Sequence, residues 1–181
     1  MYKINTSRDL SGEVTISGSK NAALPILAAT LLVRGKIKLH NVPKIGDVLT
    51  FLEIIATIGA ISRFEGNTLY LDTTHLDISK MNVEMIKKIR ASILLLSPIL
   101  HYFGNISIPF PWGCSIGKRP IDAHLNGLKS IGYDYEIDEC NINITGKPNS
   151  GDVTINAWFW VTSTENLIVA NVLRPWVTTI E

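Results

Sequence analysis

Hydrophobic and polar residues follow two different periods along this chain, and the period changes from one segment to the next. Strict alternation predicts half-buried strands, whereas apolar residues at helical spacing predict helices that pack on one face. In residues 11–75 these patterns predict the order strand, helix, strand, helix, strand, strand. The expected ranges are 14–17, 21–33, 36–40, 47–58 (ended by Gly59), and two short strands that turn at Gly66-Asn67.

The same order is predicted again along the rest of the chain. For residues 76–146 the expected elements are a weak strand at 76–78, a helix at 83–103, a strand at 106–109, a loop at 110–120, a helix at 122–131, and strands at 133–137 and 141–145. In the long helix, Asn82 is the expected N-cap and Pro98 is expected to kink or interrupt the helix. For residues 151–181 they are a strand at 153–156, a helix at 164–173 and a strand at 177–180.

Short sequence matches support a repeat with a period of about 70 residues. Gly59 and Gly132 each end a helical pattern, and Gly35 and Gly104 each precede a strand pattern. We therefore expect an α/β (α+β) domain of βαβαββ units around a pseudo-three-fold axis. The expected units are 11–75, 76–146 and 151–181, the third without its second helix and closing hairpin.

Composition narrows the class of protein. Hydrophobic residues make up 46% and charged residues 18% of the 181 residues, which favours a large core and excludes a disordered chain. The net charge of +1 predicts neither nucleic-acid nor membrane-surface binding. The N-terminus lacks the apolar stretch of a signal peptide, and the Cys and His spacings do not predict a zinc site. A cytoplasmic enzyme with free thiols and no metal is the expectation.

Positive charge lies at equivalent helix starts. Lys20 and Arg90 occupy matching places in the first two units, and Thr164-Glu165-Asn166 has the same place in the third. Helix N-termini carry a partial positive charge, so these starts would together bind phosphate, diphosphate or carboxylate groups. The alternative is that Lys20 and Arg90 are ordinary solvated charges.

The glycine-rich loop 111–120 is a second candidate for chemistry. Lys118 and Arg119 follow Cys114 closely, and nearby cations stabilise a thiolate. Cys114 is therefore a candidate nucleophile or proton donor, the alternative being a buried, inert thiol. For Cys140 we expect a buried, inert thiol.

Four motifs in chain order resemble those of the UDP-N-acetylglucosamine 1-carboxyvinyltransferase family. They are SGSKNAALPI at 17–26, RASI at 90–93, GCSIGKRPID at 113–122 and VTSTEN at 161–166. The resemblance implies the enolpyruvyl transferase fold, in which two similar domains enclose a cleft. It also implies transfer of the enolpyruvyl group of phosphoenolpyruvate to UDP-N-acetylglucosamine with release of phosphate, the first committed step of peptidoglycan synthesis, without a metal or organic cofactor.

The resemblance also implies a role for individual residues. Cys114 would be the proton donor and the site of a covalent phosphoenolpyruvate adduct, Lys20 would contact phosphoenolpyruvate, and Arg119 would bind its phosphate. The further substrate-binding residues would be Asn21, Arg90, Pro120, Ile121, Asp122, Ala123, Val161 and Thr162. Trp160, beside them, is atypical of the family.

Family members are much longer than this chain, and residues 1–10 would normally pair as a strand with a second domain that this sequence does not contain. One interpretation is therefore a truncated copy or fragment of the transferase, completed by a missing C-terminal domain or a separate chain. A second is a non-catalytic remnant that keeps partial nucleotide-sugar binding. A third is the related shikimate-pathway enolpyruvyl transferase, against which the Cys114 loop argues.

Overall fold

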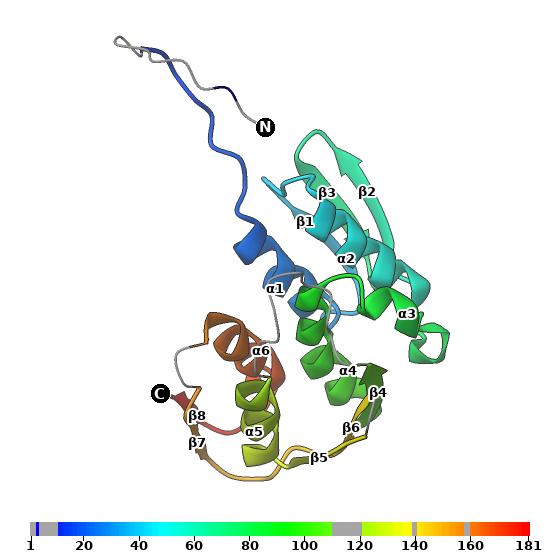
Figure 1. Cartoon of the computed structure of the whole chain (residues 1–181), viewed down its shortest axis with the longest axis vertical. Coiled ribbons are helices and arrows are strands. Elements are labelled where there is room, and N and C mark those ends of the chain that lie inside the picture. Colours follow the sequence, from blue (N-terminus) through cyan, green and yellow to red (C-terminus); the bar gives the residue numbers. More distant parts are fainter. Residues whose placement is uncertain (1–2, 4–10, 110–120, 139–140, 158–159) are drawn as a thin grey trace.

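The computed structural model describes residues 3, 11–109, 121–138, 141–157 and 160–181. Helices lie at the centre of the described fold, with three small sheets around them (Figure 1). The first unit contains α1 (Lys20–Thr30), β1 (Lys36–Leu39), α2 (Gly46–Thr57), β2 (Ile61–Glu65) and β3 (Thr68–Asp72). Its antiparallel sheet has the order β1-β3-β2, and Leu69 and Leu71 of β3 point into the core.

The strand expected at 14–17 is absent, and that prediction is wrong. Val14 and Ile16 are 82% and 78% exposed. A lone extended segment gains neither ladder hydrogen bonds nor a buried face, so alternation alone does not make it a strand. In the third unit, by contrast, the corresponding segment forms a strand, because it pairs in parallel with a neighbouring strand.

The second unit repeats the sheet of the first. Its elements are η1 (Ile78–Lys80), α3 (Val83–Ile86), η2 (Arg90–Leu95), α4 (Leu96–Phe103), β4 (Asn105–Pro109), α5 (Asp122–Ser130), β5 (Tyr133–Ile137) and β6 (Asn141–Gly146). The sheet order β4-β6-β5 corresponds to β1-β3-β2, and every pair in both sheets is antiparallel.

Two expectations for the second unit are wrong. Residues 76–78 do not form a strand; Asp77 instead caps η1, accepting a hydrogen bond from the Ser79 amide at 3.1 Å. The long helix at 83–103 is divided into α3, η2 and α4, and the chain is extended at Ile89 rather than broken at Pro98. Pro98 lies in the first turn of α4, where a missing N–H costs little. The N-cap role of Asn82 is confirmed.

The third unit contains β7 (Val153–Ile155), α6 (Val161–Asn171) and β8 (Thr178–Ile180), with β7 and β8 parallel. Its helix begins three residues earlier than the sequence predicts. Within the described ranges, no helix combines the length and the apolar character needed to cross a bilayer.

The core is formed mainly where the central helices pack on one another. Helix α6 contacts α1, α4 and α5, and Leu27, Leu96, Leu125 and Leu167 from these helices are fully buried. Gly127 allows the close approach of α5 to α6, because a Cβ there would lie 2.5 Å from Leu167 Cδ2. The distance between α5 and α6 therefore depends on the absence of a side chain at Gly127.

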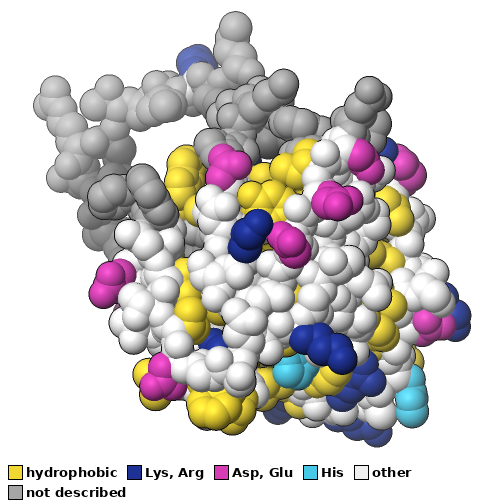
Figure 2. All heavy atoms as spheres, turned by 90° about the horizontal axis from the view of Figure 1, so that it is seen from below, with side chains coloured by type: hydrophobic (Ala, Val, Ile, Leu, Met, Phe, Trp, Pro, Cys, Tyr) yellow, Lys and Arg dark blue, Asp and Glu magenta, His cyan; other side chains and the backbone are white. Residues whose placement is uncertain are grey.

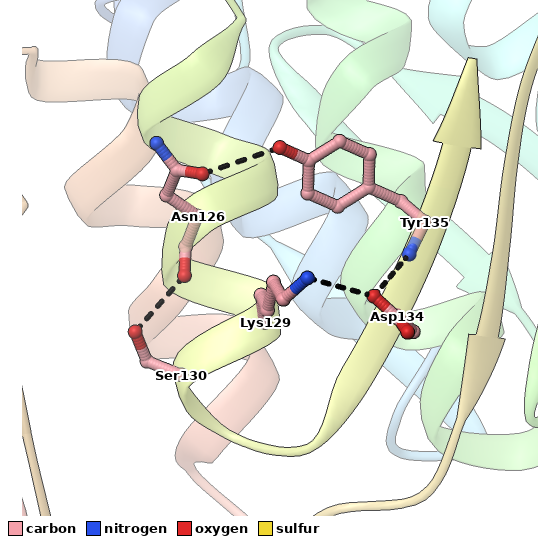
Figure 3. Close-up of polar contacts among 5 residues, drawn as sticks. All are labelled: Asn126, Lys129, Ser130, Asp134 and Tyr135. Carbon is pink, nitrogen blue, oxygen red and sulfur yellow. Dashed lines mark hydrogen bonds and ion pairs between the residues drawn. The ribbon is translucent and has the colours of Figure 1, made fainter.

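Helix α5 is also tied to the sheet by polar contacts at its exposed end (Figure 3). Lys129 Nζ lies 3.1 Å from Asp134 Oδ1, and the Tyr135 hydroxyl donates to Asn126 Oδ1 at 3.3 Å. Lys129 in the last turn of the helix also complements the helix dipole. On the face seen in Figure 2, acidic and basic side chains are interspersed over the described surface.

Candidate functional site

A cavity of about 500 Å³ lies where α1, α6 and the segment before α4 converge. Its walls come from all three units of the chain. The lining residues are Lys20, Asn21, Leu24, Pro25, Asp47, Lys88, Ile89, Arg90, Ala91, Leu94, Val161, Thr162 and Glu165. Residues that the sequence places far apart are therefore brought together here.

Helix α1 contributes its first turn to the cavity. Ser19 caps the helix, with its hydroxyl oxygen accepting from the Ala22 amide at 3.4 Å. Lys20 is the first helical residue, and its Nζ lies 2.8 Å from Asp47 Oδ2 in the first turn of α2. Gly18 is needed just before the cap, because a Cβ there would collide with the backbone carbonyl of Asn41. This close backbone approach fixes where α1 begins.

The second wall is the turn that carries Arg90. The Ser92 hydroxyl lies 2.8 Å from the Ile86 carbonyl oxygen and 2.7 Å from that of Ile89, so it holds the backbone that leads into Arg90. Burial, with a smaller contribution from the positive charge of Arg90, lowers the pKa of His124 to about 4. The imidazole beside Arg90 is therefore neutral at physiological pH.

The third wall is the beginning of α6. Val161 lines the cavity and is largely exposed, whereas Ser163 is buried and its hydroxyl donates to the backbone carbonyl oxygens of Trp160 and Ala157. Glu165 lies one turn into the helix, and burial raises the pKa of its carboxyl. The N-termini of α1 and α6 both meet the cavity, which adds two partial positive charges to it.

Charge in the cavity is mixed, with a cationic excess. Lys20, Lys88 and Arg90 are cationic, and Asp47 and Glu165 are carboxylates. Together with the helix termini, this arrangement favours anionic ligands. Clusters of three or more His, Cys, Asp or Glu side chains suited to a metal ion do not occur among the described residues.

Five of the expected site residues line the cavity, namely Lys20, Asn21, Arg90, Val161 and Thr162. Others do not line it. Ile121 is buried at the start of α5, Asp122 is exposed, Ala123 is half-buried, and Trp160 is 43% exposed. Ile121 holds the N-cap position of α5. Cys114, Arg119, Pro120 and Cys140 lie outside the described residues.

Asp47 and Lys88 were not expected in the site. A signal for Asp47 exists in the repeat, because Asp47 and Asp122 both lie in the first turn of the second helix of their unit. Lys88 belongs to a charged run that resembles any solvated surface segment. Its place in the cavity follows from the break between α3 and η2, which the periodicity did not predict.

The family model described as EPSP synthase (3-phosphoshikimate 1-carboxyvinyltransferase) matches residues 4–181. UDP-N-acetylglucosamine 1-carboxyvinyltransferase of Acinetobacter baylyi is 42% identical over 173 residues, which are 94% of this chain and 41% of that protein. The Wolbachia pipientis protein of the same name is 40% identical, with 99% of this chain and 45% of that protein covered.

Solved structures agree on the fold. The enolpyruvyl transferase NikO from Streptomyces tendae superposes with a TM-score of 0.73 at 18% identity, covering 89% of this chain and 38% of that one. EPSP synthase from Acinetobacter baumannii gives a TM-score of 0.61 at 13% identity, covering 88% and 37%. This chain therefore spans less than half the length of the proteins it matches.

The resemblance that the four motifs indicated is confirmed by these relatives, and so is the α/β fold class. The family match covers nearly the whole chain, and the structural matches show the same fold at low identity. The chain belongs to the EPSP synthase (3-phosphoshikimate 1-carboxyvinyltransferase) family and has the enolpyruvyl transferase fold.

Proposed function

We propose that this chain supplies the nucleotide-sugar and phosphoenolpyruvate site of a UDP-N-acetylglucosamine 1-carboxyvinyltransferase. One observation carries the proposal. The cavity unites Lys20 and Asn21, Arg90, and Val161 and Thr162 from three different repeat units, and these residues belong to three of the motifs that resemble this family. Relatives of that name are 36% to 42% identical to the chain.

The residue types suit the reaction. Phosphoenolpyruvate and UDP-N-acetylglucosamine are both anionic, so Lys20 and Arg90 would gather their phosphate and carboxylate groups. A sugar hydroxyl gives up its proton as its oxygen adds to C2 of phosphoenolpyruvate, and a proton adds to C3. Loss of phosphate from C2 together with a proton from C3 then restores the double bond. Cys114 would donate the proton and Arg119 would hold the phosphate, roles that rest on the motif resemblance alone.

The proposal also covers the fate of the product, the location of the reaction and the parts needed for turnover. The product would enter peptidoglycan synthesis, and the chain would act in the cytoplasm without a cofactor. Because the chain covers only 41% to 45% of these relatives, we propose that turnover needs a further domain or a separate chain, whereas binding of UDP-N-acetylglucosamine does not.

A second candidate substrate is 3-phosphoshikimate. The description of the matching family model and the EPSP synthase structures favour it. Against it stand the higher identities to the UDP-N-acetylglucosamine enzymes and the Cys114 motif. Both substrates are anionic phosphates, so the cationic cavity alone does not separate them.

Isothermal titration of the chain with UDP-N-acetylglucosamine and, separately, with shikimate-3-phosphate distinguishes these candidates. We expect saturable binding of the nucleotide sugar only, and loss of most of that affinity in Lys20→Met and Arg90→Met. Lys36→Met is the matched control, since Lys36 is exposed on β1 outside the cavity. Preference for shikimate-3-phosphate, or equal losses in all three variants, would overturn the proposal. Phosphate release measured with phosphoenolpyruvate separately tests turnover.

A further inference from the structure

Three buried polar side chains connect α4, α5 and α6. Ser97 on α4 donates to Asn166 on α6, with its Oγ 2.6 Å from Asn166 Oδ1 and 2.7 Å from the Asn166 carbonyl oxygen. The Asn166 amide nitrogen lies 3.2 Å from Nδ1 of His124 on α5. Ser97, Asn166 and His124 are 1%, 0% and 3% exposed.

The hydrogen bonds in this network have a direction. The Ser97 hydroxyl shares its one proton between Asn166 Oδ1 and the Asn166 carbonyl oxygen, and the Asn166 NH₂ group faces His124 and donates to Nδ1. A neutral imidazole that accepts at Nδ1 carries its proton on Nε2. The network therefore selects one tautomer of His124, and a proton on Nδ1 would break the hydrogen bond to Asn166.

The residues of this network neighbour cavity residues along the sequence, and one of them is affected by the charge of a cavity residue. Asn166 directly follows Glu165, and the cavity residues Val161 and Thr162 lie one turn earlier on the same helix. Ser97 lies one turn after Leu94, which also lines the cavity. The charge of Arg90 acts on His124. Any shift of α6 against α4 or α5 would move the wall formed by Val161 and Thr162 relative to Arg90.

Buried polar groups also restrict how these helices pack. Apolar contacts alone tolerate small slips between helices, whereas a buried donor or acceptor that loses its partner costs roughly 1–3 kcal/mol. The side-chain hydrogen bonds between Ser97, Asn166 and His124 form in one relative placement of the three helices. They therefore set the placement more sharply than the surrounding leucines do.

We propose that Ser97, Asn166 and His124 are positioning residues, which hold α6 against α4 and α5 so that Val161 and Thr162 stand at the distance from Arg90 that the ligand requires. The importance of that distance for nucleotide-sugar binding rests on the proposed function. The tautomer of His124 and the placement of the cavity wall do not depend on the proposed function, and both can be measured without ligand.

Asn166→Ala tests the role against a matched control, Asn171→Ala. Asn171 is on the same helix, is 8% exposed, and fixes the other end of the helix through Leu167 and Arg174. In the unaltered chain, ¹⁵N NMR of His124 should show the Nε2–H tautomer. In Asn166→Ala, the methyl resonances of Ala91, Leu94, Val161 and Thr162 should shift, while in Asn171→Ala they should stay in place. Ser97→Ala, a milder change, should give the same pattern of shifts and serves if Asn166→Ala does not fold.

Ligand binding gives the second readout. We expect Asn166→Ala to weaken UDP-N-acetylglucosamine binding by roughly tenfold or more, since small misplacements of binding groups are costly, and Asn171→Ala to leave the affinity within about twofold of the original. An Nδ1–H tautomer, or equal methyl shifts in the two asparagine variants, would overturn the positioning role. If the unaltered chain binds no nucleotide sugar, the proposed function fails, and the tautomer and methyl shifts still decide the positioning role.

Discussion

Lys20 and Asp47 join the first turns of α1 and α2 at the edge of the cavity, with Nζ 2.8 Å from Oδ2. Both side chains are 45% exposed, so the pair is hydrated and contributes less than about 1 kcal/mol to stability. The pair matters for ligand binding, because Asp47 places a negative charge beside the lysine proposed to contact phosphoenolpyruvate. The carboxylate competes with an incoming anion for Lys20.

Asp47→Asn should therefore bind phosphoenolpyruvate more tightly than the unaltered chain, by roughly threefold at low salt, with the gain shrinking as ionic strength rises. Titration at two salt concentrations measures this. Asp77→Asn is the control, because Asp77 pairs with Lys80 outside the cavity. Weaker binding in Asp47→Asn would instead mean that Asp47 orients Lys20 for the ligand.

Folding stability should depend on His124 between pH 6.5 and 4. The pKa of His124 is lowered from 6.5 to about 4, so the unfolded chain binds a proton in this window that the folded chain does not. The stabilisation is fully present above pH 6.5 and is lost as the pH falls toward 4, by on the order of 3 kcal/mol.

Urea unfolding as a function of pH measures the effect of His124. His124→Gln should flatten the change in unfolding free energy across this window, and His75→Gln, at an exposed position, should not. An unchanged pH profile in His124→Gln would show that other groups cause the acid destabilisation.

Gly132 should be intolerant of substitution. It has a φ of 107° after α5, and a Cβ there would collide with the Lys147 carbonyl oxygen. Gly132→Ala should lower the free energy of unfolding by roughly 2–4 kcal/mol, combining left-handed strain with the clash. Gly46→Ala, where a Cβ meets open space, should be neutral or stabilising. Chemical denaturation compares the two, and equal losses would contradict the backbone argument.

Arg174 should contribute to stability through the geometry of its hydrogen bonds. Its guanidinium donates to the carbonyl oxygens of Asn149 and Gly151 and to the side-chain oxygens of Asn171 and Thr178, at 2.9 to 3.0 Å. Arg174→Lys should cost about 2–4 kcal/mol, because an ammonium does not reproduce this fork of donors.

Arg63→Lys is the comparison for Arg174→Lys, since Arg63 pairs with Glu65 on the surface. That change should cost less than about 1 kcal/mol in the same unfolding measurement. A small cost at Arg174 would show that its guanidinium is replaceable.

The repeat is the part of the fold that the sequence predicted best. Gly59 and Gly132, matched by the period, both end a helix with positive φ values of 104° and 107°, and both lie tightly against a backbone carbonyl. This agreement arises because only glycine fits such a position. Helix and strand ranges next to these glycines were predicted within a few residues.

Predictions failed where structure depends on distant partners. The alternating pattern at 14–17 resembles that at 153–155, yet only the second segment has a neighbouring strand among the described residues. The break before Arg90 is held by the hydroxyl of Ser92 and was not visible in the periodicity. Lys20 and Arg90 were predicted from the repeat, whereas Lys88 and the carboxylate of Asp47 enter the site through tertiary packing.

The most direct test of the proposed site is a titration of the isotopically labelled chain with UDP-N-acetylglucosamine, followed residue by residue by NMR. The largest changes should occur at Asn21, Arg90, Val161 and Thr162, which line one cavity from three units. They should be absent on addition of an equal concentration of shikimate-3-phosphate. Changes concentrated away from this cavity, or a stronger response to shikimate-3-phosphate, would contradict the account.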